Sequence, residues 1–326
     1  MGRRLTPLLL FASLVCANLA AAPALSEWPL PWPDSLPRDP VIAADGRVWF
    51  CAQRGDFLGV FDPASERFSR FPLPPGSGPH DLAIDSDGQI WYAGNGNAHL
   101  GRLDPASGAI TPYPLPLTTM DPHTLALDGQ GSLWFTLPGS NLVGRLQLTS
   151  GNLRFVAPLT EAARPSGLLI DRRGHPRVAL FTTNRIATLG PRSMQLIEGA
   201  LPAPGARPHR LTLGADGAIW YSDSARGILG RYQPTQGWVH EWPLPGGPGS
   251  KPHGLARDAR GRIWVAETGF EPNRLVAFDP QEGRFGAALA VASGAGGIRR
   301  MRFDPARNEI WFGTDRNTLV RLRPGP

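Results

Sequence analysis

A chain of 326 residues with a formal net charge of +6 carries too little excess charge, too widely scattered, for a nucleic-acid-binding groove. Hydrophobic residues make up 41 % and charged residues 18 %, which indicates a globular protein large enough for one large domain or two average ones. The 39 Gly, 35 Pro and 10 Trp favour an all-β repeat protein over a helical one, because they imply many turns and many large aromatic anchors.

The first residues have the pattern of a secretory signal. Arg3 and Arg4 form a basic region, residues 5–16 are mostly apolar, and residues 22–24 (APA) offer a cleavage site. The apolar run is shorter than the roughly 20 residues that a bilayer span needs. We therefore predict a signal peptide over residues 1–24 and a periplasmic or secreted protein with no membrane contact after cleavage. Cys51 then has no partner for an intramolecular disulfide.

Copies of one motif follow along the chain. Residues 80–92 (HDLAIDSDGQIWY) show its plan, in which an alternating apolar stretch leads to a D-x-G turn and then to a second apolar stretch. This pattern is typical of a β-hairpin. Seven copies begin at residues 38, 80, 123, 166, 209, 253 and 300. In the fourth copy, Arg177 replaces the repeated Trp.

The segment after each hairpin supplies two further strands. A stretch such as LGRLDP at residues 100–105 ends in a turn, and a short edge segment such as ITPYPLP follows it. Four strands in about 43 residues are the size of one propeller blade. We expect the repeated tryptophans to pack between blades as core. They are Trp49, Trp91, Trp134, Trp220, Trp264 and Trp311.

The two ends of the chain complement each other. The seventh copy stops after its third strand, and residues 26–31 (SEWPLP) match the edge segment HEWPLP of the fifth copy. The N-terminal strand is therefore predicted to complete the last blade and close the ring, which pairs an edge that would otherwise be exposed. The predicted fold is an all-β, seven-bladed β-propeller with four-stranded blades over residues 25–326.

Four of the seven histidines occupy the same place in the repeat. The first strand of each propeller blade lines the central channel, so the first residue of each copy is expected near one mouth. These residues are Arg38, His80, His123, Ser166, His209, His253 and Arg300. Two interpretations stay open: the histidines brace the channel by bonding to neighbouring backbone, or some of them form a reactive site.

A second position separates the histidines into two groups. The third residue after the repeated Trp is a carboxylate only in the fifth and sixth copies, as Asp223 and Glu267. The same copies begin with His209 and His253. We expect these four side chains to cluster at one mouth, as material for proton transfer or metal binding. A pair of inter-blade hydrogen bonds is the alternative. His80 and His123 lack such a carboxylate and are expected to be structural.

The repeat resembles that of the virginiamycin B lyase family, the streptogramin B lyases, over residues 26–323. The likeness rests on segments such as PHGL at residues 252–255, GRIWVAE at residues 261–267 and the edge segment EWPLP. It implies a magnesium-dependent seven-bladed propeller that confers antibiotic resistance. The implied reaction is that of a carbon–oxygen lyase: a proton α to a carbonyl is removed, the ester carboxylate leaves, and the cyclic depsipeptide opens by elimination.

The resemblance also implies roles for particular residues. His253 would be the acid/base catalyst, Glu267 a metal ligand and His209 a substrate contact. From its place in the repeat, we also assign Asp223 to substrate binding. The family has a second metal-associated glutamate two residues before the catalytic histidine, where this chain has Lys251, its only lysine. Lysine is a poor ligand for Mg²⁺, which prefers oxygen donors. We therefore expect Mg²⁺ to bind weakly or not at all. We also expect Lys251 to be a catalytic residue whose ammonium group replaces part of the role of the metal ion.

Three functions remain open at this point. The first is an exported lyase. Its substrate would be a small molecule such as a cyclic depsipeptide or lactone, and we expect it to act as a monomer. The second is a non-catalytic periplasmic binding or scaffold propeller. The third is a lactonase of the gluconolactonase kind, whose calcium ligands are Glu, Asn and Asp inside the channel. The asparagines that follow second strands here fall in expected loops instead: Asn95, Asn97, Asn141 and Asn184.

Overall fold

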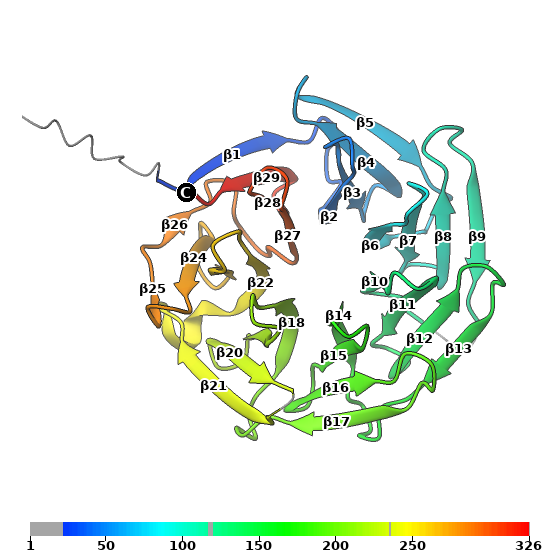
Figure 1. Cartoon of the computed structure of the whole chain (residues 1–326). Helices are drawn as coiled ribbons and strands as arrows, with labels where there is room; N and C mark the ends of the chain where they lie inside the picture. Colours follow the sequence, from blue (N-terminus) through cyan, green and yellow to red (C-terminus); the bar gives the residue numbers. More distant parts are fainter. Residues whose placement is uncertain (1–21, 117–119, 235, 326) are drawn as a thin grey trace, which may run out of the picture.

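A computed structural model describes residues 22–116, 120–234 and 236–325. Seven antiparallel sheets surround a common axis, in chain order around the ring (Figure 1). The predicted all-β, seven-bladed propeller is confirmed. The predicted signal peptide lies almost entirely outside the described residues, as residues 1–21 are not among them. No helix in the described ranges is long and apolar enough to cross a membrane.

Each blade runs outward from the axis through four strands. Blade one consists of β2 (Pro37–Ile42), β3 (Val48–Ala52), β4 (Phe57–Asp62) and β5 (Arg67–Pro72). Blade two consists of β6 (Pro79–Ile84), β7 (Ile90–Gly94), β8 (His99–Leu103) and β9 (Ile110–Pro114). Blade three consists of β10 (Leu125–Leu127), β11 (Ser132–Leu137), β12 (Leu142–Gln147) and β13 (Leu153–Val156). Blade four consists of β14 (Pro165–Ile170), β15 (Pro176–Leu180), β16 (Arg185–Leu189) and β17 (Leu196–Ala200). Blade five consists of β18 (Pro208–Leu213), β19 (Ile219–Asp223), β20 (Ile228–Gln233) and β21 (Trp238–Pro243).

The last two blades depart from this plan at their outer edges. Blade six is β22 (Pro252–Arg257), β23 (Ile263–Glu267) and β24 (Arg274–Asp279), with the outer strand divided into β25 (Arg284–Phe285) and β26 (Leu289–Ala290). Blade seven is β27 (Met301–Asp304), β28 (Glu309–Thr314) and β29 (Thr318–Arg323), with β1 (Ala24–Pro29) as its outer strand. The 3-10 helix η1 (Gly247–Ser250) precedes β22.

Strand β1 is tied to the end of the chain by backbone and side-chain contacts. It pairs antiparallel with β29 from Ala24 opposite Arg323 to Pro29 opposite Thr318. The ring of Trp28 stacks on that of Trp311, with centroids 5.6 Å apart. The first described strand and the last therefore form one sheet.

The core lies between the blades, where the repeated tryptophans were expected. Trp49 of blade one, for example, packs in a cluster with Leu82 and Ile90 of blade two. The indole N–H of Trp91 donates to Asp85 Oδ2 at 2.7 Å, so the ring also fixes the turn of its own hairpin. The degenerate fourth blade keeps this contact in another form, because Arg177 Nε donates to Asp171 Oδ2 at 2.9 Å.

The expected start of the seventh inner strand was wrong by one residue. Met301 pairs with Phe312 in blade seven as Leu82 pairs with Tyr92 in blade two. The hairpin turn of blade seven contains one more residue than that of blade two, which shifts the alignment. The position of His80 is therefore held in blade seven by Arg299, and Arg300 lies one step further into the channel.

Candidate active site at one mouth of the channel

Two successive residues at the start of each inner strand, or just before it in blades three and seven, form two rings around the axis. The register shifts near the start of β2, β6, β14, β18 and β22, and such a bulge breaks the alternation of side chains along a strand. The histidine ring consists of Arg38, His80, His123, Ser166, His209, His253 and Arg299. The inner ring consists of Asp39, Asp81, Thr124, Gly167, Arg210, Gly254 and Arg300.

His80 and His123 are braced by their neighbours. Their imidazole rings lie with centroids 3.8 Å apart. Nδ1 of His80 is 3.2 Å from the carbonyl oxygen of His123, and Nδ1 of His123 is 2.9 Å from Thr124 Oγ1. A carboxylate does approach His80, but it comes from blade one, where Asp39 Oδ2 lies 3.9 Å from Nδ1. These contacts match the structural role expected for this pair.

His209 and His253 form a second pair with different surroundings. Their rings stack with centroids 4.3 Å apart and an interplanar angle of 21°. Phe181 covers His209 from blade four, with centroids 4.4 Å apart. Nε2 of His253 is buried and has no hydrogen-bond partner within the described residues. This nitrogen therefore has an unused hydrogen-bonding position, in contrast to Nδ1 of His80 and Nδ1 of His123.

Burial and nearby arginines keep both imidazoles neutral. Burial lowers the pKa of His253 well below its ordinary value of 6.5, and His209, Arg210 and Arg299 lower it further. Burial and then Arg210 lower the pKa of His209 to about 3. A neutral imidazole has a lone pair that can accept a proton, so His253 is in the protonation state that a base requires at neutral pH.

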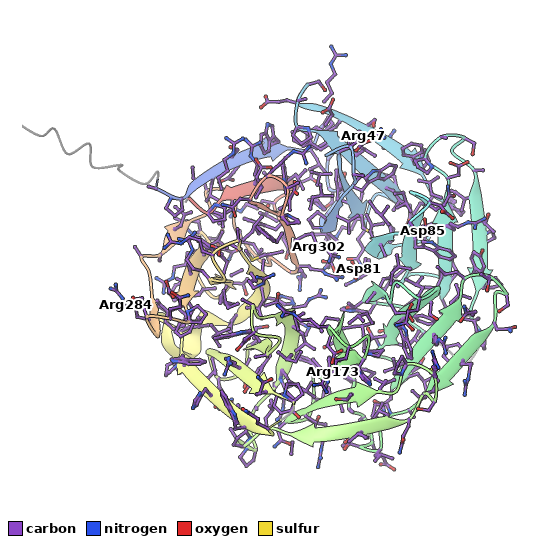
Figure 2. All side chains as sticks on the ribbon, viewed as in Figure 1. Arg47, Asp81, Asp85, Arg173, Arg284 and Arg302 are labelled. Atoms are coloured by element: carbon purple, nitrogen blue, oxygen red, sulfur yellow. The ribbon has the colours of Figure 1, made fainter. Side chains whose placement is uncertain are left out.

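The inner ring closes the channel below the histidines with ion pairs that cross it. Arg210 of blade five reaches Asp39 Oδ2 of blade one at 3.3 Å and Thr124 Oγ1 of blade three at 3.1 Å. Arg300 of blade seven pairs with Asp81 of blade two. Burial would raise the pKa of Asp39, but Arg210 and Arg300 hold it below its ordinary value. Figure 2 shows Asp81 near the axis of the ring.

Glu267 and Asp223 hold loops at this mouth. Glu267 is buried, and its Oε1 accepts hydrogen bonds from Gly246 N at 2.9 Å and Ser250 Oγ at 2.7 Å, while its Oε2 accepts one from Arg274 Nε at 2.5 Å. Asp223 accepts hydrogen bonds from the backbone N–H groups of residues 207, 225 and 226 and from the Arg226 side chain. Within the described ranges, neither carboxylate bonds to His209 or His253.

Lys251 lies in the loop that Glu267 holds. It follows η1 in a left-handed conformation, with φ 43° and ψ 57°, and its side chain is exposed. Lys251 therefore lies outside the strand that carries His253, because β22 begins only at Pro252. The Lys251 carbonyl oxygen accepts a hydrogen bond from Thr268 Oγ1 at 2.6 Å, which fixes the loop.

The side chains at this mouth do not fit Mg²⁺. Both oxygens of Glu267 are engaged by Ser250, Gly246 and Arg274. The second position that the resemblance implies carries a lysine, which offers no oxygen. The described part of the chain contains no group of three or more His, Cys, Asp or Glu side chains that could hold a metal ion. Arg38 and Arg299 of the histidine ring supply positive charge beside the imidazoles.

Sequence reasoning missed the inner ring, placed Arg300 where Arg299 lies, and gave Arg38 no role in the site. Arg299 Nη2 bonds to Asp315 Oδ2 at 3.1 Å, while its Nε is buried with no partner among the described residues. Burial and the neighbouring Arg299 lower the pKa of Arg38 to about 10. A signal was present: the residue after each ring position is Asp, Thr or Arg in four of the first five copies, inside an otherwise apolar strand.

Comparison with known proteins identifies the family. The virginiamycin B lyase family matches residues 12–275. The chain belongs to this family. Virginiamycin B lyase from Staphylococcus aureus is 23% identical, with a TM-score of 0.83 over 92% of this chain and 99% of that one. A streptogramin B lyase structure is 24% identical, with a TM-score of 0.82 over 92% and 97%.

Two further findings complete the comparison. A catalytically inactive histidine-to-alanine variant of the S. aureus lyase, solved with quinupristin, is 22% identical, with a TM-score of 0.84 over 92% of this chain and 99% of that one. No curated protein matches the chain. The structural similarity to these lyases covers 92% of the chain and supports the propeller fold over that length. The S. aureus variant was solved with a small-molecule antibiotic, quinupristin.

Proposed function

We propose that this member of the virginiamycin B lyase family opens cyclic depsipeptide esters by elimination, with His253 as the base. The observation that carries the proposal is the buried, unpaired Nε2 of a neutral His253, stacked on His209 at the mouth of the channel. In His80, by contrast, Nδ1–H donates a hydrogen bond to the carbonyl oxygen of His123, which braces the neighbouring blade. The inactivity of a histidine variant of the S. aureus lyase supports the same assignment.

The proposed step moves one proton and one electron pair. His253 takes the proton from the carbon α to a carbonyl, and the C–H electron pair forms a double bond to the β-carbon. The C–O bond of the ester breaks, and its electrons leave with the carboxylate, so the ring opens without a water molecule. The protonated His253 then returns its proton to the carboxylate or to solvent.

Negative charge that develops on the carbonyl oxygen needs a cation nearby. Arg38 and Arg299 lie in the same ring as His253, and both lower the pKa of its imidazole, after burial, His209 and Arg210. Lys251 adds an exposed cation on the rim. We propose that these groups serve in place of Mg²⁺, while Glu267 positions the Lys251 loop through Ser250 and Asp223 positions the neighbouring loop for substrate.

The loops around this mouth suit an apolar peptide ring. Met120 is 56% exposed and Leu159 is 81% exposed. Both lie in segments that lead from an outer strand into the next inner strand, and these segments end at the histidine ring. Exposed apolar side chains on loops of the same mouth favour a substrate with apolar side chains, as in depsipeptides. With the predicted signal peptide, we propose that the protein meets this substrate outside the cytoplasm.

Mass spectrometry of the product tests the proposal directly. The purified protein is incubated with quinupristin in EDTA, and the product is separated and weighed. Elimination gives a linear isomer with the mass of the substrate and a new double bond, and turnover should persist in EDTA. A product heavier by one water would instead indicate a lactonase. Saturable binding without any product would indicate a binding propeller and refute the lyase.

A further inference from the structure

A cavity with an excess of arginine lies at the other end of the channel. Its volume is about 270 Å³, and its lining includes Arg210, Arg257, Arg300 and Arg302 but, among the described residues, neither Asp nor Glu. We call it the arginine cavity. The inner ring separates it from the histidines, because its walls are the parts of β18, β22 and β27 that lead toward the hairpin turns. A neighbouring cavity of about 600 Å³ shares Arg300 and Arg302.

Arg302 breaks the pattern of the repeat. The positions that pair with the repeated Trp, or with Arg177 in blade four, are uncharged in the other blades: Val41, Ala83, Ala126, Leu169, Thr212 and Ala256. Blade seven places a guanidinium there instead, near the axis (Figure 2). Its Nε is buried without a hydrogen-bond partner in the described ranges, and the same holds for Nε of Arg210. Arg210 already bonds to Asp39 and Thr124 through its Nη atoms, whereas the side chain of the half-buried Arg302 forms no hydrogen bond in the described ranges. A partly desolvated charge of this kind is stabilised when a ligand supplies the missing acceptor.

The carboxylates nearby cannot neutralise this charge. Asp39 is bonded to Arg210, and Asp81 is paired with Arg300. Each inner-ring carboxylate therefore already has an arginine, which leaves Arg257 and Arg302 as excess positive charge along the cavity. Burial lowers the pKa of Arg302 to about 10, and Arg300 adds to the effect, so the surroundings disfavour its charge in the absence of an anion.

We propose that the arginine cavity binds a phosphate group, either as the free ion or as a monoester. Planar guanidinium groups donate pairs of hydrogen bonds that match phosphate oxygens, and several arginines around one space suit a dianion better than a single carboxylate. Leucine and phenylalanine side chains, Leu169, Leu211 and Phe303, line the same space and can contact the substituent of an ester. This site is separate from the proposed lyase centre and does not depend on it.

Calorimetry and thermal melting test the proposal on the mature full-length protein. Phenyl phosphate and inorganic phosphate are titrated separately at pH 7.5, with sodium chloride at matched ionic strength as the salt control. Saturable binding and a rise in Tm above the salt control are expected. Tighter binding of phenyl phosphate would assign the site to esters, and equal or tighter binding of inorganic phosphate would assign it to the free ion.

Arg302→Met is the decisive variant. It keeps a long side chain but removes the unpaired charge, so the ligand-free protein should melt no lower than wild type, whereas phosphate affinity should fall at least tenfold. Arg284→Met is the matched control, because Arg284 lies on the outer edge with a side chain 77% exposed, and its phosphate affinity should be unchanged (Figure 2).

A second variant protects the test against misfolding. Arg257→Met should also weaken phosphate binding, because Arg257 lines the same cavity from blade six. Phosphate affinity that is equal in wild type, Arg302→Met and Arg257→Met would overturn the proposal, as would the absence of any effect beyond the salt control. Neither result would bear on elimination at the histidine mouth, which is measured separately.

Discussion

Acidification should destabilise the protein through the four histidines of the histidine ring. Burial is the largest cause that lowers the pKa of each one, and the pKa of His209 falls to about 3. The unfolded chain therefore binds protons first as the pH drops below about 6.5, the ordinary value for histidine. The free energy of unfolding is unaffected above that pH, falls below it, and continues to fall until the pH approaches the folded-state values.

The size of the effect follows from the difference in proton binding. Each histidine that stays neutral in the fold costs about 1.36 kcal/mol for every pH unit below about 6.5, which is about 2 kcal/mol at pH 5. Four such groups amount to about 8 kcal/mol, a large part of the roughly 5–15 kcal/mol that holds a typical domain together. The folded population should therefore fall steeply between pH 6 and pH 5, as expected from this order-of-magnitude sum.

Urea denaturation at a series of pH values measures this loss. Wild type is compared with His253→Gln, which removes one buried titrating group, and with His240→Gln, which removes an exposed one. The His253 variant should lose about 2 kcal/mol less than wild type between pH 7.5 and pH 5, whereas the His240 variant should lose as much as wild type. Equal acid losses in all three proteins would refute the reasoning from burial.

Three further predictions concern the lyase and the ring. His253→Gln should lower kcat/KM about 10²–10⁴-fold on quinupristin, whereas His80→Gln should stay within about tenfold of wild type; equal losses, measured by product chromatography, would make the ring act as one unit. Deleting residues 24–29 removes β1 and Trp28, which should cost at least about 3–5 kcal/mol in urea denaturation, and an unchanged midpoint would contradict a structural role for this strand. Lys251→Glu alone should not create a tight Mg²⁺ site in calorimetry, because Arg274 and Ser250 occupy Glu267; strong binding by that variant would show that these contacts yield to the metal.

The fold was predictable because the same strand pattern recurs in every blade. The alternating hairpin and its tight turn appear in each copy, so a copy whose strands are hard to assign alone can be assigned by alignment with the others. The substitution of Arg177 for Trp hid the fourth copy only in part, since the guanidinium forms the same kind of hydrogen bond to Asp171 as the indole N–H of Trp91 forms to Asp85. The register of blade seven was not predictable in this way, because a turn one residue longer moves Arg299 into the position expected for Arg300.

The candidate site was less predictable because its contacts cross the ring. His209 and His253 could be brought together from their equal places in adjacent blades, and the structure stacks them. The ion pair between Arg210 and Asp39 joins residues 171 positions apart in the chain. No local pattern reports such a pair, and the spacing that linked Glu267 to His253 could not reveal that Arg274, on the next strand, approaches the carboxylate first.

The contacts of Glu267 explain how the mouth keeps its shape with a lysine at residue 251. A carboxylate in a buried position needs a cation or several hydrogen-bond donors. Glu267 has both, from Arg274 at one oxygen and from Ser250 and Gly246 at the other. Arg274 is itself held over the ring of Phe270, 3.8 Å from its centroid. Because Arg274 neutralises that carboxylate inside the wall, Glu267 does not compete for Arg38, Arg299 or Lys251, the groups that would supply the positive charge in the proposed elimination.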